Sequence, residues 1–134
     1  MSFSAAIKTA QATVPECVAV GYVDMTTGML LDVSTVDSHP SEVLDLVAAA
    51  TAALFQGPSV VAIEKLFRKP RGQVEDGRHY FQEMLIFSDN LLHLFMRSSK
   101  DQSHAAVFVC RGTVNIGRAL SKGRAAMKIL QEAI

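Results

Sequence analysis

The sequence predicts an α+β fold in which one central antiparallel sheet of five or six strands carries helices on its faces. Two observations predict it. Stretches with apolar residues at helical spacing lie near the start, in the middle and at the end of the chain, and short apolar runs bounded by turn residues lie between them. The 134 residues fit a single domain, 1–134, which can bury a core without a metal or a disulfide.

A short helix and a β-hairpin are predicted at the start of the chain. Phe3, Ile7, Ala10 and Val14 recur at helical spacing ahead of Pro15, which favours one buried helical stripe. The run CVAVGYVD that follows is apolar on both of its alternating faces, as in a strand that is covered on both sides. The turn MTTG and the alternating run MLLDVSTV complete the hairpin.

The segment SEVLDLVAAATAALFQ, residues 41–56, predicts a helix that ends at Gly57-Pro58. On a helical wheel, the arc expected to cover the sheet consists of Val43, Leu46, Val47, Ala50 and Leu54, with Leu44 and Phe55 at its edge. The opposite arc holds Asp45, Ala48, Ala49, Ala52, Ala53 and Gln56. This helix therefore almost lacks the charged face that contact with water would favour.

Two explanations fit the alanine arc. Its alanines could face water, because alanine favours the helix. Alternatively, a second helix could approach the small side chains closely, which would explain why lysine and arginine are missing from the segment. Since most oligomers are two-fold homodimers, we expect the partner to be a second copy of the chain, burying about 800 Å² or more per subunit.

The second half of the chain predicts further strands and a closing helix. The run SVVAIEKLFRK, residues 59–69, predicts a strand, placed at 58–68, that becomes polar toward its end, and 68–79 is interpreted as an exposed loop. Three more strands are predicted in YFQEMLIF, LLHLFMRS and HAAVFVCR. The last helix, from about Asn115, carries the apolar stripe Ile116, Leu120, Gly123, Met127, Leu130 and Ile134. Its basic residues Arg118, Lys122, Arg124 and Lys128 either face solvent or bind a partner.

Charge and composition favour neither nucleic acid nor membrane as a partner. Lysine plus arginine and aspartate plus glutamate both number 13, so no net field attracts a polyanion. We find no signal peptide and no uninterrupted apolar run of about 18 residues, and we expect a cytoplasmic protein. Cys17 and Cys110 lie in apolar strand segments, where free cysteine behaves as a small hydrophobic residue.

The sequence contains no motif that predicts catalysis or a cofactor. VFVCRGTVNIGRAL imitates a phosphate-binding loop, but Arg118 and Ala119 stand where a lysine and a hydroxyl are needed. A strand-to-helix turn with Thr113 or Asn115 as the cap fits better. The histidines are scattered, without metal-ligand spacing. We therefore expect no catalytic residue, cofactor or metal, and no binding of ATP, GTP or zinc by the isolated protein.

The motif VGYVDMTTGMLL, the helix SEVLDLVAAATAALF and the meander FQEMLIFSDNLLHLFMRS…AAVFVCRG together resemble the roadblock/dynein light chain family over nearly the whole chain. The pattern of an apolar strand, Asp24, a turn, Gly28 and an apolar strand carries the resemblance. The family is similar to profilin in fold. The resemblance implies a homodimer in which the central helix and a neighbouring edge strand pair across a two-fold axis. The implied interface is Asp45, Ala48, Ala49, Ala52, Ala53, Phe55, Val60 and Ala62.

The resemblance also implies a function. Prokaryotic-type members regulate small Ras-like GTPases, and others are adaptors on motors or signalling scaffolds, so we expect a non-enzymatic protein-interaction module. The surface expected to bind the partner is the charged segment with Arg68, Lys69, Arg71, Glu75, Asp76 and Arg78. Two alternatives stay open: a profilin-like small-molecule sensor domain and a small enzyme without a recognisable motif.

Overall fold

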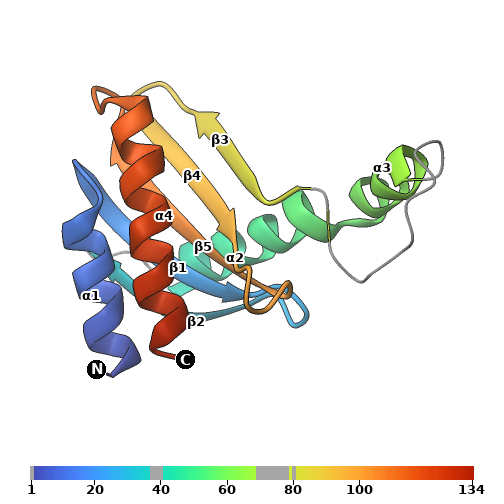
Figure 1. The fold of residues 1–134 in the computed structure, drawn as a ribbon, viewed down its shortest axis with the longest axis horizontal. Coiled ribbons are helices and arrows are strands. Elements are labelled where there is room, and N and C mark those ends of the chain that lie inside the picture. Colours follow the sequence, from blue (N-terminus) through green and yellow to red (C-terminus); the bar gives the residue numbers. More distant parts are fainter. Residues whose placement is uncertain (1, 37–40, 69–78, 80) are drawn as a thin grey trace.

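The computed structural model describes residues 2–36, 41–68, 79 and 81–134, with only the backbone described at 41–45 and 68. Its elements are α1 (Phe3–Thr13), β1 (Cys17–Asp24), β2 (Met29–Thr35), α2 (Ser41–Gln56), α3 (Pro58–Arg68), β3 (Glu83–Phe87), β4 (Leu91–Arg97), β5 (His104–Arg111) and α4 (Ile116–Glu132). The strands form one antiparallel sheet of five, in the order β2-β1-β5-β4-β3. The predicted α+β class is confirmed (Figure 1).

The first hairpin forms as predicted, and its turn explains the Asp24 and Gly28 pattern. The Asp24 carboxylate accepts the Thr26 N–H at 2.9 Å, and the Asp24 carbonyl accepts the Gly28 N–H, also at 2.9 Å. Gly28 has a φ of 71°, a conformation that glycine adopts at little cost. The turn therefore requires a short side chain that accepts a hydrogen bond at residue 24, and glycine at residue 28.

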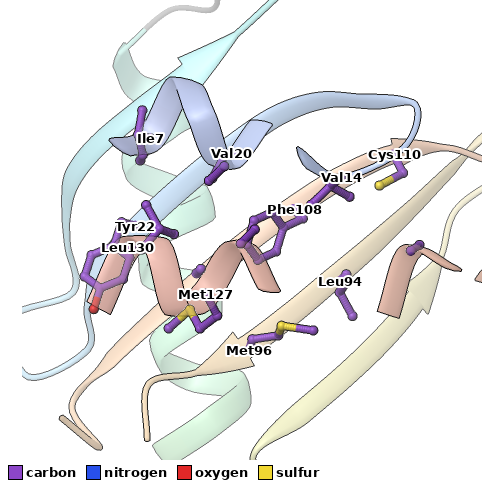
Figure 2. Packing of buried hydrophobic residues seen from close by; sticks show 14 of the residues in the cluster. Ile7, Val14, Val20, Tyr22, Leu94, Met96, Phe108, Cys110, Met127 and Leu130 are labelled. Atoms are coloured by element: carbon purple, nitrogen blue, oxygen red, sulfur yellow. The ribbon is translucent and has the colours of Figure 1, made fainter. Parts of the chain in front are cut away.

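Helices α1 and α4 lie side by side on one face of the sheet (Figure 1). The core between them and the strands contains Ile7, Val20, Tyr22, Leu94, Met96, Phe108, Met127 and Leu130 (Figure 2). A Cβ atom at Gly123 would lie 2.7 Å from the Leu94 Cδ2 atom, so glycine lets α4 approach the sheet closely. Two members of the predicted α4 stripe, Ile116 and Ile134, lie at its ends and are exposed. The Asn115 side chain caps α4 by accepting the Arg118 N–H.

Helix α2 covers part of the opposite face, where a second core forms. Its buried residues are Val23, Met25, Ala48, Phe55, Phe95, Ala105 and Val107. Phe55 and Phe95 meet edge to face with ring centroids 6.5 Å apart. The sheet is therefore enclosed by two helices on one side and by one on the other.

The predicted strand at 58–68 is wrong, because this segment forms helix α3. Pro58 begins the helix, the position where its missing N–H costs least. The half-buried Val60 and Val61 and the buried Glu64 recur at helical spacing. The helical period was not recognised in the sequence because the inward position 64 holds a charged glutamate. The β-branched residues Val60, Val61 and Ile63 favoured a strand instead.

Within the described residues, the helical stretch Leu46–Phe67 is long and apolar enough to cross a membrane by length and composition alone. The sequence was expected to lack an uninterrupted apolar run of membrane-spanning length. This stretch is interrupted by Gly57-Pro58 and contains the charged residues Glu64 and Lys65. Only 17% of its apolar window is buried. The stretch therefore presents apolar side chains to its surroundings over most of its length.

Candidate protein-interaction surface

The two faces of α2 are not those that the helical wheel predicts. Ala48, Thr51 and Phe55 are fully buried against the sheet, whereas Leu46 is 70% and Val47 42% exposed. Thr51 fits the apolar side because its hydroxyl donates to the Val47 carbonyl at 2.8 Å, which satisfies its hydrogen bond within the helix. The predicted sheet-covering arc is therefore wrong at Leu46, Val47 and Ala50, which are exposed, and the predicted outward arc is wrong at Ala48.

The predicted interface residues separate into three groups. Ala48 and Phe55 belong to the chain's own core, and Ala52 is half-buried against it, so these side chains are covered within one subunit. The exposed members are Ala49, Ala53 and Ala62, and Val60 is half-buried. The side chain of Asp45 lies outside the described residues. A role for any of them in a dimer stays a prediction.

Helix α3 adds apolar residues to the exposed surface of α2. It follows α2 directly and projects beyond the sheet (Figure 1). Ile63 is 41% and Leu66 67% exposed, and they share one helical face with Ala62. We define the α2–α3 apolar surface as Leu46, Ala49, Ala50, Ala53, Ile63 and Leu66. Several large apolar side chains exposed on two neighbouring helices mark a candidate site of interaction.

A buried arginine fixes the end of α2 to the sheet. Arg97, the last residue of β4, is 4% exposed. Its guanidinium donates to the Phe55 carbonyl at 2.6 Å, to the Gln102 carbonyl at 2.8 Å and, through Nε, to the Phe81 carbonyl at 3.0 Å. It also lies 5.0 Å from the centroid of the Phe55 ring. The positive charge sits at the carboxyl end of α2, where the helix dipole favours it.

Burial lowers the pKa of Arg97 to about 10, and the negative charge of Glu64 opposes this shift. Glu64 is itself buried, and its carboxylate lies 2.8 Å from Nδ1 of His79. The His79 backbone N–H donates to the Gln102 side chain at 3.1 Å. These contacts connect α3 to the residues that lead into β3, so the positions of α2, α3 and β3 are linked.

Among the described strands, β3 lies at the edge of the sheet, beside β4. Alternate residues along β3 bond to β4. The Arg97 N–H donates to the Gln82 carbonyl, and the Ser88 N–H donates to the Leu91 carbonyl. Met84 and Ile86 lie between Gln82 and Ser88 at the same two-residue spacing, so their backbone groups also face β4. Leu85 therefore directs its N–H and carbonyl outward. The side chains of Leu85, Ile86 and Phe87 are 37%, 39% and 56% exposed. The edge can thus pair with another strand and bury apolar residues.

The start of β3 is held to α4 by an ion pair. Arg124 donates to both carboxylate oxygens of Glu83, at 2.9 and 2.7 Å. The hydrogen bonds from Arg124 lower the pKa of Glu83. This stabilisation is present above the ordinary pKa of glutamate and is lost as the pH falls through the lowered value. The pair is partly exposed and is screened by salt, so it positions the edge strand more than it stabilises the fold.

The predicted partner-binding residues cannot be placed. Lys69, Arg71, Glu75, Asp76 and Arg78, and the side chain of Arg68, lie outside the described residues. The segment begins at the end of α3 and returns at His79, next to Glu64. Its role in partner binding stays a prediction.

Two features of the described residues bear on chemistry with a small molecule. They contain no group of three or more His, Cys, Asp or Glu side chains that could hold a metal ion. A cavity of about 120 Å³ lies between α2 and the sheet and is lined by apolar residues, among them Val23, Leu30, Val47 and Val107. Ligand sites commonly enclose about 300–1,000 Å³. This cavity is small, and Thr35 is the one polar side chain in its lining, fewer than a sensor uses to orient a ligand.

Comparisons with solved structures identify the fold. The chain is similar to Myxococcus xanthus MglB, with a TM-score of 0.70 and 15% identity over 97% of this chain and 92% of that chain. A structure described as MglB with tetrameric arrangement matches with a TM-score of 0.70 and 19% identity over 98% of this chain and 92% of that one. A Roadblock/LC7 domain from Streptomyces avermitilis matches with a TM-score of 0.66 and 12% identity over 98% of this chain and 97% of that chain. No protein-family model and no curated protein sequence matches the chain.

These comparisons confirm the resemblance to roadblock proteins at the level of the fold. The order of elements, together with the pattern around Asp24 and Gly28, thus led to the correct fold. Two features of the site were missed: the helical nature of α3 and the buried Arg97. In the sequence, Arg97 is only a polar residue at the end of a strand, and the carbonyls that it binds belong to distant segments.

We predict that Arg97→Leu lowers the free energy of unfolding by about 3–5 kcal/mol, because the carbonyls around it and Glu64 lose a buried cationic partner. Arg111→Leu is the matched control, since Arg111 is exposed at the end of β5 and its loss should cost less than about 0.5 kcal/mol. Urea denaturation of both variants measures the difference. Equal stabilities would show that Arg97 does not anchor α2.

Proposed function

We propose that this chain is a non-enzymatic homodimeric module that regulates, or acts as an adaptor for, small Ras-like GTPases. The observation that carries the proposal is the α2–α3 apolar surface on a chain with the fold of a Roadblock/LC7 domain. That surface is too apolar to face water in a soluble domain, and it lies on elements that the sheet alone leaves partly uncovered.

A second copy of the chain is the partner that fits this surface best. Leu46 and Leu66 are among the most exposed large apolar residues described, and Ala49, Ala50 and Ala53 allow a second helix to approach closely. The chain carries no net charge, so two copies do not repel each other over long range. In a two-fold dimer each α2 then supplies the apolar cover for the other.

The edge strand of this dimer is β3 instead of the 58–68 segment. The resemblance implies that an edge strand pairs beside the central helix, and 58–68 is helical. Leu85 offers an outward N–H and carbonyl, and its neighbours Ile86 and Phe87 are exposed. Pairing of β3 with its copy extends the sheet across the two-fold axis and covers these apolar side chains.

Partner recognition is assigned to a surface outside the dimer. Once α2 is covered by its copy, a GTPase must bind elsewhere. The segment 68–79 mixes basic and acidic residues on a chain without net charge, which suits steering and alignment of a charged partner. The small-molecule sensor is the weaker alternative, because the apolar cavity beside α2 is small.

For the dimer, we predict that Ala49→Arg produces a monomer, because a long charged side chain enters the contact between helices. The dissociation constant should rise at least about 100-fold. Sedimentation equilibrium at micromolar concentration measures it. Ala5→Arg is the matched control: Ala5 is an exposed alanine of α1, on the opposite face of the sheet, and should leave the dimer intact. A wild-type protein that sediments as a monomer would refute the dimer.

For the edge strand, we predict that Leu85→Pro weakens dimerisation at least about tenfold while the monomer stays folded, because proline removes an outward N–H that β4 does not use. Ile86→Pro should instead lower the stability of the fold, since Ile86 bonds to β4. Sedimentation and thermal unfolding separate the two effects. A Leu85→Pro dimer as tight as wild type would exclude β3 from the interface.

For the partner, we predict that the dimer binds a Ras-like GTPase of the same organism and distinguishes its GTP and GDP forms at least about tenfold. Surface plasmon resonance with each nucleotide form measures this. No binding of either form at about 100 μM would remove the GTPase proposal while leaving the dimer untouched.

The same assay tests the charged segment. Deleting residues 70–77 and closing the gap with a short turn keeps α3 and His79, so dimerisation should persist while GTPase binding is lost. Unchanged binding would show that 68–79 is only a connecting loop.

A further inference from the structure

The two cysteines of the chain are direct neighbours across two strands. Cys17 begins β1, Cys110 lies near the end of β5, and they are register partners in the antiparallel ladder. The Arg111 N–H donates to the Glu16 carbonyl at 3.0 Å, which makes the cysteines a non-hydrogen-bonded pair. Cα atoms of such pairs lie about 4.5 Å apart, within the range that a disulfide spans.

As register partners, the two thiols also lie on the same side of the sheet. Cys110 is fully buried in the core beneath α1 and α4, and the half-buried Cys17 packs against that core. Cys17 Sγ lies 3.2 Å from the Ala19 carbonyl oxygen. The interaction with Cys17 lowers the pKa of Cys110, whereas the interaction with Cys110, together with burial, raises the pKa of Cys17. Both sulfurs are free thiols in this structure.

The β1 strand can adjust locally at this point. Its register with β5 shifts between Cys17 and Ala19, which is the mark of a bulge. The preceding residue, Glu16, has a φ of 52°, and its carboxylate accepts the Thr113 hydroxyl at 2.8 Å. A bulge beside the pair allows the small change in backbone that a sulfur–sulfur bond requires, without disturbing the ladder further along.

We propose that Cys17 and Cys110 form an oxidation site that hydroperoxides convert into a cross-strand disulfide. The half-exposed Cys17 is the sulfur that peroxide reaches. The Cys17 sulfur attacks one peroxide oxygen. The S–O bond forms and the O–O bond breaks, and the departing hydroxide takes the Cys17 proton and leaves as water, giving a sulfenic acid.

Cys110 then attacks the sulfur of the Cys17 sulfenic acid. The S–S bond forms, the S–O bond breaks, and the Cys110 proton leaves with the hydroxyl group as water. Together, two thiols and one peroxide yield one disulfide and two waters, so the peroxide is the oxidant. The cross-link closes a long loop of chain between β1 and β5 and stabilises the fold.

The test uses the full chain treated with hydrogen peroxide. We expect both thiols to disappear in a thiol assay of the denatured protein, with the monomeric mass lower by two hydrogen atoms. The melting temperature should rise by at least about 5 °C and return after reduction with dithiothreitol. Peroxide treatment of Cys110→Ser in the presence of dimedone should trap the sulfenic acid on Cys17.

Cys17→Ser is the control and should show no shift in melting temperature on peroxide treatment. Two thiols that persist in the treated wild-type protein would overturn the proposal. So would a product joined only between chains, or sulfinic acids formed without an internal disulfide. The thiol and mass measurements need only the wild-type protein, so the proposal stays testable if a variant fails to fold. It is independent of the GTPase and dimer assignments.

Discussion

The buried guanidinium of Arg97 is the constraint on which the interaction surface depends. It binds the carbonyl end of α2 and the residues before β3 at the same time, and the charge of Glu64 ties α3 to this centre. An arginine is suited to this task because its planar group has several fixed donors and stays charged even where burial lowers its pKa. Without it, α2 could shift over an apolar sheet that offers few directional contacts. The exposed face of α2 is therefore set by hydrogen bonds at one end of the helix.

The sequence was sufficient for elements whose patterns are local. The hairpin follows from alternation and from Gly28, and α1 from a regular stripe that includes Ile7 and Ala10. The orientation of α2 could not be predicted, because nearly every position is apolar and the one hydroxyl on its buried side, that of Thr51, is satisfied by its own helix. Helix α3 was missed because Glu64 faces inward, and its partner His79 is far along the chain. These errors arise because the contacts that decide the orientation of α2 and α3 cannot be read from the spacing of apolar residues along the sequence.

The two faces of the sheet have different roles. On one side, α1 and α4 enclose a core so close that Gly123 has no room for a side chain. On the other, α2 leaves Leu46 and Val47 exposed. The proposed disulfide lies on the enclosed side and the proposed dimer contact on the open side, so oxidation can change stability without altering the residues that would meet a partner.

The junction between α2 and α3 has a mechanical consequence. Gly57 donates its N–H to Ala53, and Val61 donates to the Gly57 carbonyl, so helical bonding continues on both sides of Pro58. Proline has no N–H for this bonding, which makes the junction the one weak joint in an otherwise stiff rod. The 11 residues of α3 span about 16 Å, so a tilt of about 10° at the joint would carry its far end through about 3 Å. Because Arg97 holds α2 to the sheet, such a tilt would move the end of α3, where the charged segment begins, and it would have to break the contact between Glu64 and His79.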